Sequence, residues 1–470
     1  MANFPGNFLR VTLGGTALAV MALVGPVAAE SVFTPTGLGF VGNVSASSAE
    51  RGKPIVAGGK AVIAGTGLLP GQEITLQRGA TVLSGDTPVI VDAEGNFSVE
   101  VDVDSEASVG LQPVLVIAEK PAAATVVEVK VSPDLPLSGA EKFEATVVAT
   151  PASPYQTAYS AASNAIFVTA AVGRPPVTDS TLSKVDATTL ETLASINPAA
   201  APARPDGSDG GLFAVYGIAV DDVNGNVWVT NTRQNTLSVY SQADLSLVKQ
   251  FEPGVTPHAF SVEIDAAKGR AFVSLGRGAT IEVFDTTTLE HVGSVALQST
   301  VRGQSFGGQD IDLDAESGTL VAVSNTTAEI AVLDTETLEA RVLPVAGLRS
   351  ASSIAYDAKD DVVFIVAQGS DNVVIAKASD GSVLHDVKTG AGALYVTFEP
   401  VSGLAFVANR GAGTVTVVSP AGEVVANLDA GSLPNEVKAD GLGNVWLVNK
   451  SLGDEDATGN RLHKLTPVAQ

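Results

Sequence analysis

Cationic residues recur at one position of a repeated pattern in the later part of the chain. Arg233 in VTNTRQN, Arg277 in VSLGRGA, Arg410 in VANRGAG and Lys450 in VNKSLG each follow an apolar stretch typical of a strand end. A guanidinium group forms two parallel hydrogen bonds that match carboxylate and phosphate groups. These residues therefore suggest binding of an anionic small molecule or of an acidic segment of a partner.

A second set of residues could act as acid and base. His258 lies in VTPHAF, Gln309 and Asp310 in GGQDID, and Asn435 and Glu436 in PNEVKA. An imidazole paired with a carboxylate is the arrangement that general acid–base hydrolysis uses. A hydrolase of the lactonase type is therefore one alternative, although no residue is assigned a catalytic role.

Several short motifs lack the structural context that their chemistry requires. GQSFG, residues 303–307, fits a hydrolase nucleophile pattern, but that motif needs a strand followed by a helix. GLGFVG, residues 37–42, has no βαβ unit around it, so it is no dinucleotide site. GDEDATGN, residues 453–460, is more typical of a solvated acidic loop than of a calcium site. The four His residues are scattered, so no metal or cofactor is predicted.

The N-terminal residues 1–29 have the pattern of a removable export signal. Arg10 precedes the apolar run VTLGGTALAVMALVG, and the small residues of Val27–Ala29 supply a cleavage site. A spanning helix needs about 20 apolar residues, whereas this run contains a Gly pair and ends at Pro26. We therefore expect a periplasmic protein that is not inserted in the membrane after cleavage, with secretion or the cell surface as the alternative.

The composition limits the partners and the chemistry further. The net charge is −24 at pH 7 and becomes one unit more negative if the signal is removed. Such a field repels nucleic acid and anionic membranes, so an anionic ligand needs a local positive patch. Both Met residues, Met1 and Met21, lie in the signal, and the chain has no Cys. Disulfides, thiolate metal sites and Met-ligated haem are therefore excluded.

Residues 30–132 alternate apolar and polar residues in short runs separated by Gly, Pro and Asp, a pattern typical of an antiparallel β-sandwich. The runs are KAVIAG from Lys60, EITLQR from Glu73, NFSVEVDV from Asn96, QPVLVIAE from Gln112 and TVVEVKVS from Thr125. GTGLLPGQEITL and AEGNFSVEV resemble the immunoglobulin-like domains of exported bacterial proteins. Residues 133–141, which include PDLPLSG, are predicted to be a linker.

From residue 142 onward an apolar triplet recurs every 40 to 61 residues. Its central residues are Phe167, Trp228, Phe272, Val321, Phe364, Phe406 and Trp446. A period of this length with several strands per unit predicts an all-β propeller of seven sheets. The last repeat lacks an outermost strand, and we expect KFEATVVAT, residues 142–150, to supply it and so to close the ring.

The triplets themselves carry a family resemblance. VWVTN from Val227, AFVAN around Phe406 and VWLVN around Trp446 are similar to the Tyr-Val-Thr-Asn signature. Residues 142–470 thus resemble a YVTN-repeat seven-bladed β-propeller of the YncE family. The resemblance implies that the loops entering each blade share one face with the loops after each second strand. These loops carry Arg174, Arg204, Arg233, Arg277, Arg302, Arg349, Arg410 and Lys450.

Seven of the ten Arg residues between residues 142 and 470 would thus lie on one face. The leading hypothesis is an exported binding or scaffold protein whose Arg-bearing face takes an anionic small molecule or a protein partner. The alternatives are the lactonase-type hydrolase and a structural module of the cell envelope. The Arg residues could also reflect a duplicated turn preference, with each side chain solvated or paired to an Asp. The sequence gives no indication of oligomeric state.

Overall fold

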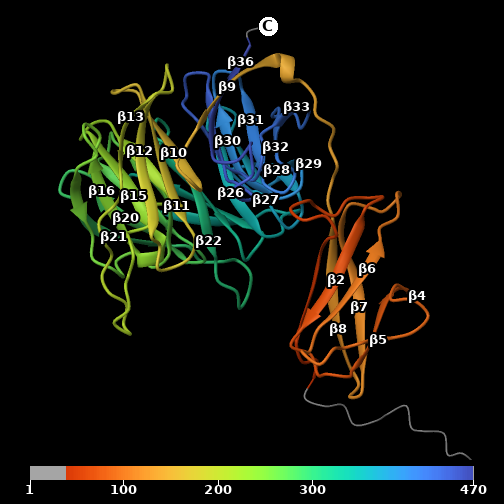
Figure 1. The fold of residues 1–470 in the computed structure, drawn as a ribbon. Coiled ribbons are helices and arrows are strands. Elements are labelled where there is room, and N and C mark those ends of the chain that lie inside the picture. Colours follow the sequence, from red (N-terminus) through yellow and green to blue (C-terminus); the bar gives the residue numbers. More distant parts are fainter. Residues whose placement is uncertain (1–38, 469–470) are drawn as a thin grey trace, which may run out of the picture.

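The computed structural model describes residues 39–468 and divides them into two β domains (Figure 1). The expected export signal lies outside the described residues. The smaller domain is a sandwich of two antiparallel sheets, ordered β1-β2-β6 and β4-β3-β7-β8, with β5 paired to β3. Its strands are β1 (Asn43–Ser48), β2 (Lys60–Thr66), β3 (Glu73–Arg78), β4 (Thr81–Val82), β5 (Val89–Ile90), β6 (Phe97–Asp102), β7 (Gly110–Glu119) and β8 (Ala123–Val131).

The alternating pattern of the sandwich strands accounts for its core. Residues of β2, such as Ala61 and Ile63, and of β3, such as Ile74 and Leu76, are fully buried at every second position. They pack with Val116 of β7 in one apolar cluster that joins the two sheets. The five runs predicted as strands lie on β2, β3, β6, β7 and β8.

The larger domain consists of seven four-stranded antiparallel sheets. The first three are β10 (Pro154–Ser160), β11 (Ala165–Val172), β12 (Asp179–Asp186), β13 (Thr192–Ile196); β14 (Ile218–Asp221), β15 (Asn226–Asn231), β16 (Thr236–Ser241), β17 (Leu247–Gln250); and β18 (Ala259–Asp265), β19 (Arg270–Leu275), β20 (Thr280–Asp285), β21 (Glu290–Ala296). The next three are β22 (Gly308–Asp314), β23 (Thr319–Ser324), β24 (Glu329–Asp334), β25 (Ala340–Pro344); β26 (Ala351–Asp357), β27 (Val362–Ala367), β28 (Asn372–Lys377), β29 (Val383–Lys388); and β30 (Ala393–Glu399), β31 (Leu404–Asn409), β32 (Thr414–Val418), β33 (Val424–Asp429).

The last sheet closes the ring with a strand from the start of the domain. It contains β34 (Pro434–Ala439), β35 (Val445–Asn449), β36 (Arg461–Pro467) and β9 (Phe143–Ala149), which follows the short 3-10 helix η1 (Ala140–Lys142). β9 pairs with β36 along its whole length, which confirms the predicted closure. The first strand of each sheet packs against the first strand of the next, and β34 packs against β10. The result is a β-propeller-like all-β domain whose first strands surround a central channel.

The recurring residues of the sequence hold the same places in every sheet. The seven triplet centres all lie on second strands and are at most 1% exposed, so Trp228 and Trp446 are core residues as predicted. An acidic residue ends five of the seven first strands and accepts backbone N–H groups of the following turn, as Asp221 does from Val223 and Asn224. The sequence Asp-x-x-Thr-Leu-Glu recurs from Asp186, Asp285 and Asp334 and forms a similar turn, in which Asp186 accepts the N–H groups of Thr188 and Thr189.

The Asn of the recurring triplet also has a structural task. Asn231, Asn409 and Asn449 end their strands and are fully buried. The Asn449 amide donates to the carbonyl oxygens of Ser432 and Thr458 at 2.8 Å each and so ties neighbouring loops to the strand end. A buried amide without such partners would be costly, so the motif maintains the fold and does not by itself indicate a ligand.

The sandwich contacts the face of the ring formed by the loops that enter the first strands and by the loops after the second strands. We call this the basic face; it is at the bottom of the ring in Figure 1. Lys130 of β8 donates to the Asp371 carboxylate and to the Gln368 carbonyl oxygen, at 2.7 Å each. Arg349 and Glu128 form a second pair across the contact at 2.5 Å. Among residues 39–468, no helix has the length and apolarity needed to cross a membrane.

Candidate functional site

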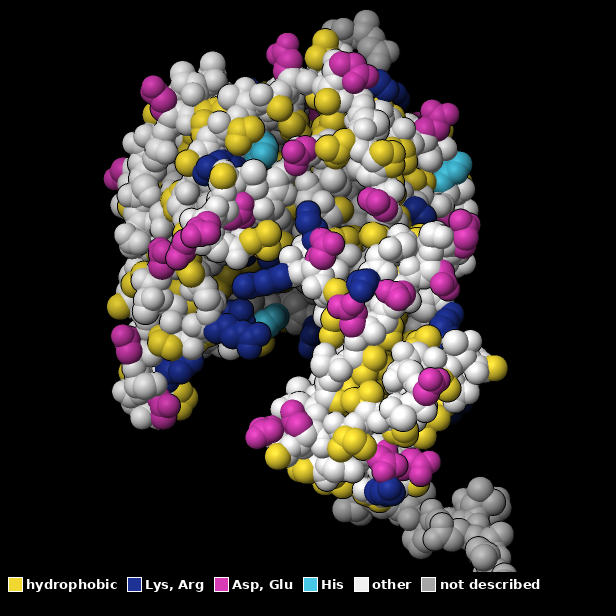
Figure 2. Space-filling model, turned by 45° about the vertical axis from the view of Figure 1, so that its right-hand side comes forward, with side chains coloured by type: hydrophobic (Ala, Val, Ile, Leu, Met, Phe, Trp, Pro, Cys, Tyr) yellow, Lys and Arg dark blue, Asp and Glu magenta, His cyan; other side chains and the backbone are white. Residues whose placement is uncertain are grey.

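All eight predicted cations lie in loops of the basic face. Arg410 and Lys450 directly follow second strands, and Arg174, Arg233 and Arg277 lie two residues beyond one, with Arg233 in the short 3-10 helix η2 (Thr232–Gln234). Arg204, Arg302 and Arg349 lie in loops between sheets. Figure 2 shows Lys and Arg side chains, with a His among them, around a hollow on the side of the ring that faces the sandwich. The eight residues therefore lie on the same face of the ring.

At the centre of this face, aromatic rings form the wall of a small cavity. The aromatic cavity has a volume of about 180 Å³ and is lined by Ser153, Tyr155, Ala171, Gly173, Tyr216, Thr232, Arg233, His258, Phe260 and Lys450. The Tyr155 and Tyr216 rings meet edge to face with their centroids 4.7 Å apart. The Lys450 Nζ lies 4.1 Å from the centroid of the Tyr155 ring, and the Arg233 Nε donates to the Tyr216 hydroxyl at 3.4 Å.

The loop carrying His258 is held in an unusual backbone conformation. His258 has φ +55°, and its N–H donates to the Asn235 side chain at 2.8 Å. A Cβ at Gly276 would lie 2.4 Å from the His258 ring, so only Gly fits beside it. Arg277 follows with φ +63°. Non-Gly residues with positive φ also occur in turns of other sheets, as at Leu190 and Leu289, so these two values do not by themselves mark a site.

Asn435 positions Arg410 at the edge of the site. Its side-chain oxygen accepts a hydrogen bond from the Arg410 guanidinium, and its amide donates to the Tyr155 backbone oxygen at 2.7 Å. Arg410 lines an adjoining open cavity of about 750 Å³, and Lys450 lines both this cavity and the aromatic cavity. Asn435 is therefore a positioning residue, and Lys450 lies where the two cavities meet.

Burial and like charge lower the pKa values of the cations at this site. Burial, followed by repulsion from Arg410 and Arg233, lowers the pKa of Lys450 to about 7. Burial also lowers the pKa of Arg410 and of His258, and for His258 the charges of Arg233 and Arg277 add to the effect. The site therefore holds positive charge that an anion would stabilise.

Most cations of the basic face have no carboxylate partner. In the part of the chain that the structure describes, seven of the eight cations have no carboxylate oxygen within 4.0 Å, and Arg349 with Glu128 is the exception. For Arg349 the expectation of a free binding cation is wrong, because the sandwich supplies its partner. Arg174, Arg204, Arg277, Arg302 and Gln309 line neither the aromatic cavity nor the open cavity beside it.

Below the aromatic cavity, polar side chains of the first strands close the channel. The Asp310 carboxylate accepts hydrogen bonds from Ser261 and Ser353, and the Glu436 carboxylate accepts from the Thr157 hydroxyl at 2.9 Å. The space between these side chains is about 30 Å³, the share of a single water. His258 lines a different cavity, so the structure does not bring it together with Asp310 or Glu436 as the hydrolase hypothesis requires.

The other mouth of the channel is acidic. It is an open cavity of about 770 Å³ whose lining includes Glu263, Asp312, Asp314, Glu316, Asp357, Lys359, Lys438 and Asp440. Lys438 donates to Glu263 at 2.6 Å and lies 3.4 Å from an oxygen of Asp312. Although burial lowers the pKa of Lys438, the attraction of Glu263 and Asp312 outweighs this effect and raises it.

Sequence reasoning missed these charged residues of the inner strands. Glu263, Asp312 and Lys438 each lie two positions beyond a residue of the inner channel, namely Ser261, Asp310 and Glu436. Because side chains alternate along a strand, every second residue of a first strand faces the channel. Applying this alternation to the first strands, two residues beyond Ser261, Asp310 and Glu436, would have found them.

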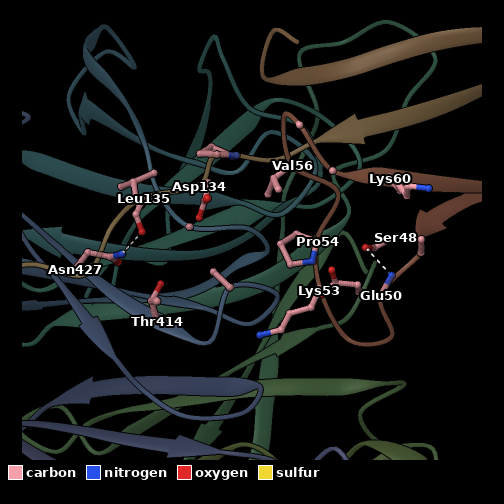
Figure 3. Close-up of a pocket in the computed structure, with 16 residues that line it drawn as sticks. Ser48, Glu50, Lys53, Pro54, Val56, Lys60, Asp134, Leu135, Thr414 and Asn427 are labelled. Atoms are coloured by element: carbon pink, nitrogen blue, oxygen red, sulfur yellow. Dashed lines mark hydrogen bonds between the residues drawn. The ribbon is translucent and has the colours of Figure 1, made fainter. Parts of the chain in front are cut away.

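A further cavity, of about 460 Å³, separates the sandwich from the ring (Figure 3). Its labelled lining includes Glu50, Lys53 and Asp134 as well as Asn427, whose amide donates to the Leu135 oxygen at 3.0 Å. Side chains of both charges line this cavity, and the Asn427 amide already has a hydrogen-bond partner. In residues 39–468 no group of three or more His, Asp or Glu side chains is placed to hold a metal ion.

Comparison with solved structures supports the fold. The structure of U3-55K is similar to the chain, with a TM-score of 0.54 and 11% sequence identity, over 70% of this chain and 99% of that chain. At this identity the likeness shows a β-propeller-like fold and nothing about function. No protein-family model matches the chain, and no curated protein matches its sequence.

Proposed function

We propose that the protein is an exported binding protein whose basic channel mouth holds an anionic small molecule. The observation that carries the proposal is the absence, within the described residues, of a carboxylate within 4.0 Å of Arg233, Arg277, Arg410 or Lys450. In a chain with a net charge of −24, four cations grouped without acidic partners form a local exception. An anion in the aromatic cavity would lie beside Arg233 and Lys450, with Arg410 in the adjoining open cavity.

The long-range field and the local site have opposite signs, which favours a small ligand over a large one. Nucleic acid or an anionic membrane would meet the negative charge of the whole molecule. A small anion needs only the aromatic cavity of about 180 Å³. An acidic segment of a protein partner is the alternative ligand, and the sandwich beside the same face would then be a second contact surface.

We further propose the finer identity of the two domains and the compartment. The seven sheets form a seven-bladed propeller of the YVTN-repeat, YncE-like type, and the sandwich is immunoglobulin-like. The triplets ending in Asn231, Asn409 and Asn449 support the first assignment. The export-signal pattern of residues 1–29 supports a periplasmic location. Mass measurement of the protein purified from the periplasm would test cleavage before Glu30.

Thermal unfolding with small anions tests the binding proposal. The panel is sulfate, phosphate, lactate and citrate, each compared with sodium chloride at equal ionic strength. A ligand at 100 times its Kd that binds only the folded state adds about 2.7 kcal/mol of stability. Because the unfolding entropy is about 2.1 cal/mol/K per residue, this corresponds to a rise in Tm of roughly 4 °C for a domain as large as the ring.

The result that contradicts the proposal is an unchanged Tm with every anion of the panel. A rise that persists in a variant with Arg233, Arg277 and Arg410 all changed to Ala would place the binding elsewhere. A control variant removes three exposed cations away from the site, Arg51, Arg78 and Lys359. It has the same net charge, so it separates the local site from the overall field.

A further inference from the structure

Lys450 differs from the other cations of the basic mouth in its surroundings. It directly follows β35, is only partly exposed, and places its Nζ over the Tyr155 ring at 4.1 Å from the centroid. No carboxylate oxygen lies within 4.0 Å of it in residues 39–468, whereas Lys438 at the opposite mouth contacts two. Its amine therefore faces a cavity without an acidic partner.

On the side of the aromatic cavity, the titratable groups around Lys450 with an ionic charge are basic. Arg233 and His258 line that cavity with it, and Arg410 adjoins it in the open cavity. The open cavity also contains Asp454, Asp456 and Arg461, of which Asp456 is occupied in accepting the Leu452 N–H at 2.8 Å. Burial and the two nearest Arg residues lower the pKa of the Lys450 amine to about 7.

A lysine amine that is neutral near neutral pH has chemistry that a surface lysine lacks. An ordinary lysine, with a pKa of about 10.4, is almost wholly protonated at pH 7 and has no free electron pair. Desolvation and a neighbouring cation are the features that turn lysine into a nucleophile toward carbonyl groups. The aromatic walls supply the first feature, and Arg233 and Arg410 supply the second.

We propose that Lys450 condenses with the carbonyl group of a small anionic carbonyl compound, such as a 2-oxo acid, whose carboxylate is held by Arg233 and Arg410. The inference rests on the proposed anion site and names its ligand class. The Nζ electron pair forms a C–N bond to the carbonyl carbon. The carbonyl oxygen then leaves as water with both amine hydrogens, and a C=N bond remains. The step is reversible and needs no oxidant or reductant.

The dimensions of the site suit such a ligand. A volume of about 180 Å³ has room for several waters and so for a short-chain acid. Tyr216 and Phe260 offer apolar surface for a short side chain on the acid. The carboxylate and carbonyl of a 2-oxo acid are adjacent, as the Lys450 amine is adjacent to its two guanidinium neighbours.

Reductive trapping with pyruvate tests the inference. The full-length protein is incubated with pyruvate and cyanoborohydride, which reduces the C=N bond to a stable amine, and the modified lysines are identified by peptide mass spectrometry. We expect Lys450 to gain a carboxyethyl group on the order of a hundredfold faster than the exposed Lys359, because far more of its amine is neutral at pH 7. Acetone, which has no carboxylate, should label Lys450 much more slowly.

Two variants separate the covalent step from anion binding. Lys450→Arg keeps a basic side chain without a primary amine and should lose the label, while Arg233→Ala keeps the amine and should slow labelling about tenfold or more, as expected for one charge-assisted hydrogen bond. Equal labelling of Lys450 and Lys359 would overturn the inference. A Tm raised by lactate without pyruvate labelling at Lys450 would also overturn it and leave the anion site intact. No thermal shift with any anion would overturn the anion site itself.

Discussion

The two mouths of the channel are built from the same strands and differ in how their charges are arranged. At the acidic mouth Lys438 is paired with Glu263 and Asp312 at 2.6 and 3.4 Å. At the basic mouth Arg233, Arg410 and Lys450 have aromatic, amide and hydroxyl neighbours and no carboxylate within 4.0 Å, among the residues described. The repeat determines where the side chains lie, and the two mouths differ in whether their cations are paired with carboxylates.

This difference separates charges that support the fold from charges that are free for a ligand. A buried ion that loses its partner is strongly destabilising, so Lys438 and its acids depend on one another. Partly exposed cations without partners contribute little to stability and keep their attraction for an external anion. Mutations at the two mouths should therefore change different properties.

The largest effect should come from neutralising the basic mouth. Changing Arg233, Arg277 and Arg410 together to Ala removes charge-assisted hydrogen bonds worth about 1.5–3 kcal/mol each. We expect affinity for the anions that bind the native protein, measured by calorimetry, to fall at least about a hundredfold. The unfolding free energy should change by only about 1 kcal/mol. A loss of stability without a loss of affinity would assign these Arg residues to the fold.

The acidic mouth should respond in the opposite way. Lys438→Met leaves Glu263 and Asp312 without their cation and should lower the unfolding free energy by about 2 kcal/mol in urea titrations, with anion binding unchanged. The loss is smaller than for a fully buried pair because 34% of the Lys438 side chain is exposed. The exposed Lys359 at the same mouth is the control, and its change to Met should cost less than about 0.5 kcal/mol.

The carboxyls of the inner channel should make stability depend on pH. Burial raises the pKa of Glu436 to about 8 and that of Asp310 to about 6. A raised pKa means that the folded state keeps a proton that the unfolded chain has released. Their contribution is therefore complete below about pH 4 and is lost as the pH rises through the folded pKa.

Replacing Glu436 with Gln isolates this effect. Gln cannot titrate, so the variant should lose less unfolding free energy than the native protein between pH 5 and pH 8. The difference should be on the order of 1 kcal/mol for each unit of pKa shift that it removes. Urea unfolding at pH 5 and pH 8 measures this difference. The same change in unfolding free energy between the two pH values in both proteins would contradict the raised pKa of Glu436.

The smallest effect is expected at the contact between the sandwich and the ring. Glu128 and Arg349 have side chains 42% and 55% exposed, so Glu128→Gln should cost less than about 1 kcal/mol. Asp371→Asn should cost more, because that carboxylate is 2% exposed and accepts both Lys130 and the Gly392 N–H. Equal losses in the two variants would show that burial does not govern the contact.

Much of the ring could be predicted from the sequence because its signals are local and repeated. A buried triplet centre such as Phe272 and the closing strand β9 each follow from spacing along the chain. The family resemblance put the cations on one face, because it implies the direction in which each strand runs. These expectations required no knowledge of which sheets are neighbours.

The pairing of charges could not be predicted because it depends on distant neighbours. Arg349 meets Glu128 across 221 residues, and Lys438 meets Glu263 across 175. Lys450 reaches the Tyr155 ring only because the last sheet closes against the first. A sequence pattern identifies a charge, whereas three-dimensional packing decides whether it has a partner.

Anomalous diffraction from crystals soaked in selenate would test the contrast between the mouths most directly. Selenate has the charge and the oxygens of sulfate and adds a strong anomalous signal. We predict a peak in or beside the aromatic cavity, within hydrogen-bonding distance of Arg233, Arg410 or Lys450, and no peak at the acidic mouth. An empty basic mouth in crystals whose other cations bind selenate would contradict the account.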